Sequence, residues 1–546
     1  MRDVAAVLKD ACAAAETQHV VGFLAYEAAA ALDSACVTHE PAAGLPLAWF
    51  GVFGPPETHD ELPGCGDEEP CLGEWVASVS REEYDASLDR IRSFLLEGDT
   101  YQVNYSFRLR SPFSASPYAL FHALQRSQQA RHSVFIETDA FAIASASPEL
   151  FFELDGDRLR SRPMKGTAAR GLTYAQDLQA GDLLRESGKN RAENIMIVDM
   201  IRNDLGRIAN AGSVRPVSLF DIERYPTVLQ MTSTVEAKSD ASLYQVMRAM
   251  FPCASVTGAP KIRTMQIIKQ LESSPRGVYT GCVGMMGPGR QASFNVAIRT
   301  VSVDKHARQA EYGVGGGIVW DSVNASEYAE CLTKAAVLTR VVPEFDLLET
   351  LLWEPDAGFF LLEVHLDRLR NSAHYFGFKM DHHAIQQRLH ETAVRFTTSA
   401  KRVRLLLARD GELRLEHADA SIPVAPLSVV LAEDPIDASD PFLYHKTTHR
   451  VVYERARQAR PGADDVILYN ERGEVTEFTS ANLVIERDGQ RVTPPVECGL
   501  LGGTFRQVLL DRNEITESII TIDDLKSADK ITLINSVRRC VEVLLS

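Results

Sequence analysis

The sequence lacks the features that mark several classes of protein. Its nine cysteines are odd in number and scattered over 546 residues, which argues against a disulfide framework or a zinc knuckle and indicates reduced thiols. No segment reaches the ~18 apolar residues of a membrane span. The opening segment MRDVAAVLKDACAAAETQHVV contains acidic and polar residues where a signal peptide needs an apolar core. We therefore expect a soluble, cytoplasmic protein without a membrane partner.

Basic residues are also in the minority. The chain has 57 Lys and Arg against 74 Asp and Glu, a formal net charge of −17, and this acidic balance argues against nucleic acid as a partner. An anionic substrate is still compatible with that total, because local basic residues set the potential of a pocket. With 45% hydrophobic and 24% charged residues, the composition is typical of a globular protein.

Strand-like and helix-like segments alternate along the chain. Residues 81–96 place apolar side chains at helical spacing, and a similar helix is expected at 189–205. Residues 56–72 are rich in Pro, Gly and acidic residues and predict a surface loop. A fresh strand pattern begins after Pro343 and predicts a domain boundary there. We therefore divide the chain into residues 1–78, 79–342 and 343–546.

A first group of distinctive segments lies between residues 145 and 335. SASPELFFEL ends a strand with Glu149, and RPMKGTAARG places Lys165 in a tight turn that also holds Thr167. ASVTGAPKIRTMQII opens a helix after Thr257 and Gly258, which is the chemistry of an anion-binding helix N-terminus. These segments predict a site for a small anion.

Carboxylates in the same region could hold a metal ion. Glu327 and Glu330 are three residues apart on one helical face and, with Glu193, could supply the oxygen ligands that Mg²⁺ prefers. Arg299, Lys334 and the backbone amides of the glycine-rich run at 313–317 are candidate anion donors, so the pocket would suit a small dicarboxylate. Taken alone, an i,i+3 Glu pair is more often a solvated helix face, and a lone lysine in a turn is usually structural.

The order and spacing of these segments resemble the chorismate-utilising enzyme family. The resemblance runs from about residue 80 to 340, with a weaker similarity at 22–33. Residues 163–167 read Pro-Met-Lys-Gly-Thr, as aminodeoxychorismate synthases do, where anthranilate and salicylate synthases typically have Pro-Ile-Ala-Gly-Thr. Gln102 stands where isochorismate and salicylate enzymes carry a lysine that activates water. The resemblance thus implies amination at C4 of chorismate.

The resemblance also implies roles for individual residues. Lys165 would attack C2 of chorismate while Glu149 protonates the leaving C4 hydroxyl. Mg²⁺ would bind the ring carboxylate from the three glutamates already named. The remaining substrate contacts implied are Thr167, Thr257, Gly258, Tyr279, Arg299, Gly315, Gly316 and Lys334. Asn190 and Gln230 depart from the family pattern, which often has an acid and a histidine there.

The ammonia source is expected to be a second protein. A glutaminase of the usual class needs a nucleophilic cysteine in a glycine-flanked elbow and a distant His-x-Glu. Cys65 has glycine on both sides, but it lies in the Pro-, Gly- and acid-rich segment 56–72, which predicts a surface loop and not such an elbow. The resemblance therefore implies a separate glutamine amidotransferase partner, with free ammonia as a poorer substitute.

A second group of segments follows residue 343. LLEVHLDRLR, YHKTTHRV, GEVTEFTSANL and LLGGTFRQ together resemble fold-type IV pyridoxal phosphate enzymes, which include branched-chain and D-amino acid aminotransferases and aminodeoxychorismate lyase. Lys446 would bind the cofactor covalently, and Glu477 would face its pyridine nitrogen. Its phosphate would be bound by Arg368, Ser480, Ala481, Asn482, Gly503 and Thr504. Alone, Lys446 would be interpreted as a loop lysine.

The two resemblances together imply an α+β protein. A chorismate-utilising domain, a large layered arrangement of sheets and helices that includes residues 1–78, would precede a fold-type IV aminotransferase-like α/β domain, through which the chain would dimerise. The implied activity is two-step synthesis of 4-aminobenzoate, the folate precursor, because the product of the first domain is the substrate of the lyase. Two alternatives are a second domain that transaminates another amino acid and a chorismate-family subunit with only a regulatory role.

Overall fold

The computed structural model describes residues 3–42, 44–59, 62–64, 73–340, 342–421 and 426–546. Internal contacts divide the chain into two compact units. Unit 1 comprises Met1–Ala169 and Ala180–Val342, and unit 2 comprises Arg170–Gln179 and Pro343–Ser546. The seven cysteines that are described are free thiols, whereas Cys65, Cys71 and part of the expected loop at 56–72 lie outside the described residues. Across the described ranges, no helix is both long and apolar enough to cross a membrane.

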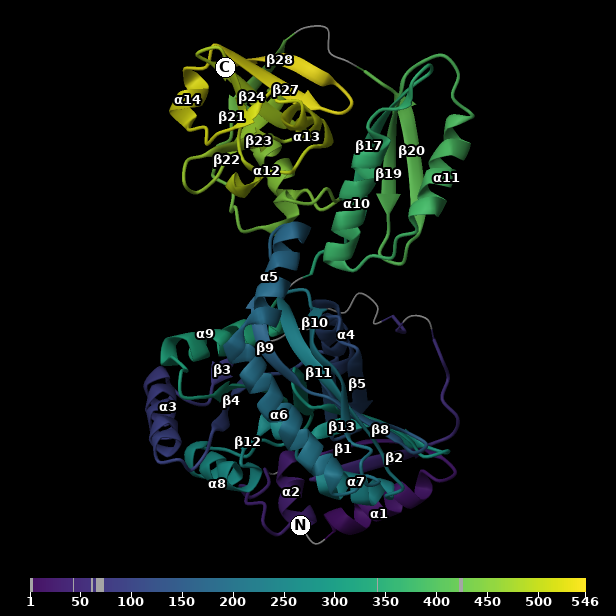
Figure 1. The fold of residues 1–546 in the computed structure, drawn as a ribbon, viewed down its shortest axis with the longest axis vertical. Helices are drawn as coiled ribbons and strands as arrows, with labels where there is room; N and C mark the ends of the chain where they lie inside the picture. Colours follow the sequence, from purple (N-terminus) through teal and green to yellow (C-terminus); the bar gives the residue numbers. More distant parts are fainter. Residues whose placement is uncertain (1–2, 43, 60–61, 65–72, 341, 422–425) are drawn as a thin grey trace. The chain divides into compact units, whose positions relative to one another are not determined.

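Unit 1 contains two antiparallel sheets (Figure 1). The nine-stranded sheet has the order β10 (Arg215–Arg224), β11 (Val228–Lys238), β8 (Arg158–Arg162), β7 (Leu150–Asp155), β14 (Gln291–Val296), β13 (Cys282–Gly287), β1 (His19–Leu24) and β2 (Ala48–Phe53), with β9 (Met164–Ala169) also paired to β11. The seven-stranded sheet has the order β12 (Gly258–Ala259), β4 (Gln102–Pro112), β16 (Gln309–Ile318), β15 (Thr300–Asp304), β6 (Phe141–Ser147) and β5 (His132–Glu137), with β3 (Val76–Ala77) paired to β4.

Helices pack on both sheets of unit 1. The nine-stranded sheet contacts α1 (Val4–Ala14) and α6 (Gly188–Gly206), which also contact α7 (Leu243–Met250). The seven-stranded sheet contacts α3 (Arg81–Leu96), α4 (Pro117–Gln128), α8 (Lys261–Leu271) and α9 (Asn324–Ala335). Two further helices in this part of the sequence are α2 (Ala29–Leu32) and α5 (Tyr174–Glu186).

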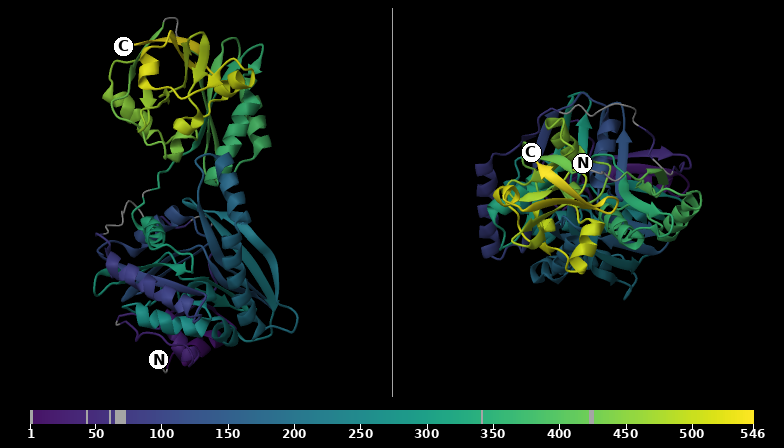
Figure 2. Two further views of the ribbon diagram at one scale, coloured as in Figure 1. Left: turned by 60° about the vertical axis from the view of Figure 1, so that its left-hand side comes forward. Right: turned by 90° about the horizontal axis from the view of Figure 1, so that it is seen from above.

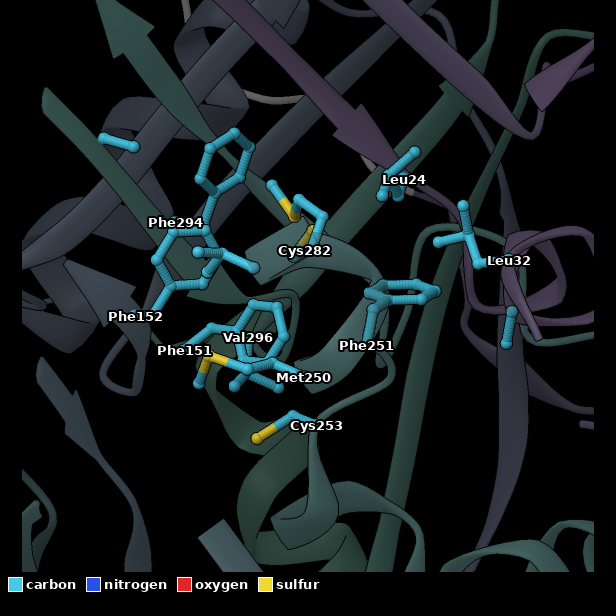
Figure 3. Packing of buried hydrophobic residues seen from close by; sticks show 14 of the residues in the cluster. Leu24, Leu32, Phe151, Phe152, Met250, Phe251, Cys253, Cys282, Phe294 and Val296 are labelled. Carbon is cyan, nitrogen blue, oxygen red and sulfur yellow. The ribbon is translucent and has the colours of Figure 1, made fainter. Parts of the chain in front are cut away.

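Separate apolar clusters hold these layers together. Figure 3 shows one in which Phe151, Phe152 and Phe294 from the nine-stranded sheet pack with Met250 and Phe251 from the end of α7. A second cluster joins residues of both sheets, namely Phe23 and Val283 of the larger sheet with Phe141 and Ile143 of the smaller. Burying one such side chain contributes about 1.5–3 kcal/mol, so the sheets form a stable support for the loops at their edges.

The helices expected from apolar spacing are confirmed. The segment 81–96 is α3, where Ser80 and Glu83 form a capping box and Leu88 and Ile91 are buried. The capping box pairs backbone N–H groups that would otherwise have no partner at the start of the helix. The segment 189–205 is α6, extended by one residue at each end.

Unit 2 contains two sheets, with helices beside them (Figure 2). The four-stranded sheet has the order β18 (Gly358–Phe359), β17 (Leu347–Glu354), β19 (Lys401–Leu407) and β20 (Leu413–Asp419). The eight-stranded sheet has the order β23 (Val475–Phe478), β22 (Asp465–Tyr469), β21 (Leu427–Leu431), β28 (Arg539–Leu545), β27 (Lys530–Asn535), β24 (Asn482–Arg487), β25 (Gln490–Thr493) and β26 (Thr516–Glu517). The helices are α10 (Leu362–Phe376), α11 (His382–Ala393), α12 (Val451–Ala459), α13 (Thr504–Asp511) and α14 (Ile522–Lys526).

The segment Arg170–Gln179 packs as part of unit 2, a grouping that the sequence analysis did not propose. Arg170 bonds Asp177 and the carbonyl of Tyr375, and its guanidinium lies 4.3 Å from the centre of the Tyr375 ring. Leu172 packs against an apolar cluster of unit 2 that includes Leu443. Both polar and apolar contacts therefore attach this segment to unit 2.

Candidate active sites

A cavity of about 400 Å³ in unit 1 gathers most of the residues proposed from the first group of segments. It is lined by Glu149, Lys165, Thr167, Glu193, Tyr279, Arg299, Gly315, Gly316, Glu327, Glu330 and Lys334. These residues come from β9, β16, α6, α9 and nearby loops. Both sheets therefore contribute to one cavity, although its residues are far apart in the sequence.

Thr257 and Gly258 do not line this cavity. The Thr257 hydroxyl donates to the carbonyl oxygens of Cys253 and Ala254, at 3.2 and 3.1 Å. Gly258 has φ +143°, and a Cβ there would lie 2.1 Å from the carbonyl oxygen of Gln102. The expected anion-binding helix begins only at Lys261. The Thr257 side chain bonds to the preceding turn, and Gly258 packs against the backbone of Gln102.

Lys165 is positioned as an available amine. It lies on β9, which pairs with β11, and among the described residues its Nζ has no hydrogen-bond partner. A Cβ on Gly317 would lie 2.7 Å from this Nζ and 2.6 Å from Nε2 of Gln102, so glycine at 317 makes room for both side chains. Burial lowers the pKa of Lys165, Lys334 lowers it further, and Glu193 opposes the shift. The lysine is therefore easier to deprotonate than a surface lysine.

Glu149 is a buried acid in the same cavity. It follows β6 and is 3% exposed, and within the described part of the chain its Oε1 has no hydrogen-bond partner. Burial raises the pKa of Glu149 to about 7, although Ser255 and Lys165 act in the opposite direction. A carboxyl with this pKa can give up or accept a proton near neutral pH.

The carboxylates of α9 lie beside the cationic groups of the cavity. Glu330 Oε1 is 2.7 Å from Lys334 Nζ, which also donates to the Gly315 carbonyl at 2.9 Å. Arg299 donates to the Lys334 carbonyl at 3.0 Å. The positive charge of Lys334 is the main reason that the pKa of Glu330 is lowered. The i,i+4 spacing of this pair is a sequence signal for an ion pair, which the sequence analysis did not use.

The donors suit Mg²⁺ by chemistry but are not assembled as a three-carboxylate centre. Among the described residues, no group of three His, Cys, Asp or Glu side chains is arranged to hold a metal ion. Glu193, Glu327 and Glu330 nevertheless line one cavity and offer only oxygen ligands, which Mg²⁺ prefers. Glu330 would have to exchange Lys334 for the ion.

Asn190 and Gln230, which depart from the family pattern, both lie beside the strand of Lys165. Gln230 donates to the Gly166 carbonyl at 2.9 Å and accepts from the Thr167 hydroxyl at 3.2 Å. Asn190 lies beside Gly166, where an added Cβ would be 3.1 Å from the Asn190 Cβ. Gln230 therefore helps to hold the backbone next to the nucleophile candidate, whereas the Asn190 amide donates to the Ser187 hydroxyl at 2.9 Å and only packs beside Gly166.

A second cavity, of about 620 Å³, lies in unit 2. Every residue proposed for the cofactor lines it, namely Arg368, Lys446, Glu477, Ser480, Ala481, Asn482, Gly503 and Thr504. They come from α10, β23, β24, the start of α13 and the loops between these elements. The local motifs of the sequence thus converge on one site.

Lys446 and Glu477 are the buried titratable pair of this cavity. Burial, together with the nearby Arg368 and Arg450, lowers the pKa of Lys446 to about 8. Burial raises the pKa of Glu477 to about 7. Tyr453 and the Leu501 N–H donate to Glu477 Oε1 at 2.9 and 3.2 Å, and Asn482 donates to Oε2 at 3.1 Å. Three donors therefore fix this carboxylate.

Two residues that the sequence analysis missed hold Arg368 in place. Glu349 accepts from Arg368 at 2.9 and 2.6 Å and lies 2.7 Å from His365 Nδ1. The other nitrogen of His365 is 3.2 Å from the Thr504 hydroxyl. Although burial opposes the shift, Arg368 and His365 lower the pKa of Glu349 to about 2. This buried network fixes the arginine next to the first residue of α13.

The donors of this second cavity fit pyridoxal phosphate. Lys446 offers an amine, Glu477 a carboxylate, and the start of α13 offers N–H groups and the Thr504 hydroxyl for a phosphate. A Cβ at Gly503 would lie 1.8 Å from Asn482 Oδ1, so only glycine lets the two segments meet. At Gly502 the nearest atom is 4.0 Å from an added Cβ, so the surrounding structure leaves room for a side chain there.

Two family models match successive parts of the chain. Residues 56–340 match the family described as chorismate binding enzyme, and residues 346–545 match amino-transferase class IV. Aminodeoxychorismate synthase component 1 of Bacillus subtilis (strain 168) is 36% identical over 287 residues, which cover 52% of this chain and 61% of the relative. Anthranilate synthase component 1 1 of Haloarcula marismortui is 38% identical over 302 residues, or 55% of this chain and 60% of the relative.

A solved structure supports the fold of unit 1. Anthranilate synthase component I from Streptococcus pneumoniae TIGR4 has a TM-score of 0.55 and 23% identity, covering 61% of this chain and 85% of that chain. At this identity the likeness concerns the fold. The chain spans about three fifths of the length of the two curated relatives, and these two differ in the reaction that their names give.

Proposed function

The chain belongs to the chorismate-binding enzyme family and carries a class IV aminotransferase domain after it; from this premise we propose that it makes 4-aminobenzoate and pyruvate from chorismate and ammonia. The observation that carries the proposal is the presence, in one chain, of a cavity with an available Lys165 and a second cavity with a buried Lys446. The first would form aminodeoxychorismate, and the second would consume it. Product analysis of one incubation tests this proposal.

In the first step, neutral Lys165 attacks C2 of chorismate while the C4 hydroxyl leaves. Glu149 gives its proton to that hydroxyl, which departs as water. Ammonia then adds at C4, and the C2–nitrogen bond breaks to release Lys165. Arg299 and Lys334 bind the carboxylates of the substrate. Mg²⁺, held by Glu193, Glu327 and Glu330 when bound, would supply positive charge for a substrate carboxylate.

In the second step, aminodeoxychorismate loses pyruvate and its ring becomes aromatic. Pyridoxal phosphate, when bound through Lys446, supplies an electron sink. Lys446 moves the proton that must leave the ring, and its pKa of about 8 suits proton exchange near neutral pH. Glu477 would hold the cofactor nitrogen, while Arg368, Thr504 and the N–H groups at the start of α13 would bind its phosphate.

Ammonia would come from a partner protein. The curated relative from Bacillus subtilis is named component 1, which supports a separate subunit that supplies ammonia. We propose a glutamine amidotransferase in this role, and a dimer formed through unit 2. Two other activities would give different products. Unit 2 would transaminate another amino acid, or unit 1 would form anthranilate. The lysine at 165, in place of the alanine that anthranilate synthases typically have, disfavours anthranilate.

Glu149→Gln is expected to lower aminodeoxychorismate formation by about 10²–10³-fold. Glutamine keeps the shape of the side chain but cannot transfer the proton. Because the folded pKa of Glu149 is about 7, the protonated fraction falls as pH rises through that value, so kcat/KM of the wild type should decline on the alkaline side. That alkaline decline should disappear in Glu149→Gln. A variant that keeps the same decline would remove Glu149 from the role of acid.

Glu330→Gln is expected to raise the Mg²⁺ concentration that gives half-maximal synthase activity by roughly 10–100-fold. The substitution removes a negatively charged oxygen ligand and also its bond to Lys334. Glu311→Gln on β16 is the matched control, because Glu311 pairs with Arg110 away from the cavity. Titration of Mg²⁺ at saturating chorismate measures the effect. An unchanged Mg²⁺ response in Glu330→Gln would place the metal elsewhere.

A further inference from the structure

The cavity of unit 2 contains more cationic side chains than the cofactor needs. Arg402, Arg404 and Arg538 line it, and none of them was assigned a role by the sequence analysis. The other two arginines of the cavity are committed to the protein. Arg368 is bonded to Glu349 and the Gly502 carbonyl, and Arg450 donates to the Thr479 carbonyl.

The register of the four-stranded sheet turns two of these arginines into the cavity. Thr350 of β17 is paired with Arg404 of β19, and Leu352 with Arg402. Alternate residues of a strand share one face of a sheet, and Thr350 itself lines the cavity. Arg404 donates to Glu416 of β20 at 3.0 Å, an exposed pair. Arg402 has no hydrogen-bond partner for its side chain in the described parts of the chain.

Arg538 approaches from the other sheet. It lies in the turn between β27 and β28, where Asn535 Oδ1 accepts from the N–H groups of Val537 and Arg538 at 3.0 and 2.7 Å. The turn is therefore fixed, while the Arg538 guanidinium has no ion-pair partner among the residues described. The next residue, Arg539, bonds Glu354 at 2.7 Å and does not line the cavity.

Among the described residues, no acidic side chain that lines the cavity pairs with these arginines, and the Glu416 partner of Arg404 does not line it. Of the acidic side chains that line the cavity, Asp419 is bonded to Lys401 and Ser399, and Glu477 is bonded to Tyr453 and Asn482. Two fixed elements, β19 and the β27–β28 turn, thus present guanidinium groups to the same space. Guanidinium groups bind carboxylates in a forked geometry that an ammonium group cannot reproduce.

We infer that Arg402, Arg404 and Arg538 form the substrate-recognition wall of the second site and select an amine that carries two carboxylates. An ordinary amino acid has one such group, for which one arginine suffices. Aminodeoxychorismate has one carboxylate on the ring and another on the enolpyruvyl group. This inference rests on the proposed function, and it names the residues that distinguish a lyase substrate from the monocarboxylate substrates of many aminotransferases.

The test compares Arg538→Gln and Arg404→Gln with the control Arg539→Gln in the full-length protein loaded with pyridoxal phosphate. Pyruvate release is measured over a range of supplied aminodeoxychorismate. The first two variants should raise KM by roughly tenfold or more, the loss expected for one charged hydrogen bond, while keeping the cofactor absorbance at ~400 nm. Arg539→Gln should match the wild type. Unchanged KM in both cavity variants, with wild-type pyruvate release intact, would overturn the inference.

A second measurement separates failure of this inference from failure of the proposed function. If the wild type releases no pyruvate, the lyase assignment fails, and the absorbance at ~400 nm is then followed while alanine or glutamate is added. The inferred wall predicts a response to glutamate at lower concentration than to alanine, and loss of that preference in Arg404→Gln and Arg538→Gln. Equal responses of the wild type to both amino acids would contradict the wall independently of the lyase reaction.

Discussion

Lys165→Ala is expected to reduce formation of aminodeoxychorismate from chorismate and ammonia by about a thousandfold or more, because it removes the nucleophile of a covalent route. The same variant should convert supplied aminodeoxychorismate to 4-aminobenzoate at the wild-type rate. Lys165 belongs to unit 1, whereas the second cavity is built by unit 2. Separate assays of the two reactions, each with its own substrate, measure this difference.

Lys238→Ala is the control for this experiment. Lys238 lies on β11, the strand that pairs with β9, but its side chain is exposed and forms a 3.5 Å ion pair with Asp157. It should leave both reactions unchanged. Mass spectrometry of the wild type with chorismate and no ammonia should find the substrate attached to the peptide of Lys165. A Lys165→Ala variant that keeps most of its synthase activity would contradict covalent catalysis.

Lys446→Ala is expected to abolish two properties together: the absorbance at ~400 nm that pyridoxal phosphate acquires on a lysine, and the release of pyruvate. The side chain is the proposed attachment point and the proposed proton carrier, so one substitution removes both. Aminodeoxychorismate should accumulate instead of 4-aminobenzoate and pyruvate, because unit 1 still has Lys165. Spectroscopy and chromatography of the same sample give the two results.

Lys530→Ala provides the comparison in unit 2. Lys530 lies on β27 and forms an exposed 2.7 Å ion pair with Glu542, away from the residues that line the cavity. The Lys530→Ala variant should have the same absorbance and the same pyruvate release as the wild type. An unaltered absorbance in Lys446→Ala would place the cofactor on another lysine, and continued pyruvate release would remove Lys446 from the reaction.

Local motifs made much of both sites predictable. Short segments such as the one around Lys165, or the Gly-Gly-Thr that ends at Thr504, combine backbone geometry with chemistry within a few residues. All proposed residues of the second cavity line it, as do those of the first apart from Thr257 and Gly258. A glycine and a threonine before a helix suit a tight backbone as well as an anion site, and here Gly258 meets the backbone of Gln102.

Features that depend on contacts between distant strands were not predictable. Arg404 reaches the second cavity because β19 pairs with β17 in one register, and a shift of one residue would turn it to the opposite face. Glu349 was overlooked because a glutamate within an apolar strand shows its purpose only when Arg368 and His365 are seen around it. The packing of Leu172 with unit 2 likewise has no local sequence signal.

The central claim is that one chain performs both reactions, and one incubation tests it most directly. Purified protein would be mixed with chorismate, an ammonium salt, Mg²⁺ and pyridoxal phosphate, and the products separated by chromatography. We predict 4-aminobenzoate and pyruvate in equal amounts. Accumulation of aminodeoxychorismate without 4-aminobenzoate would contradict the lyase assignment of unit 2, and anthranilate or salicylate would contradict the role proposed for Lys165.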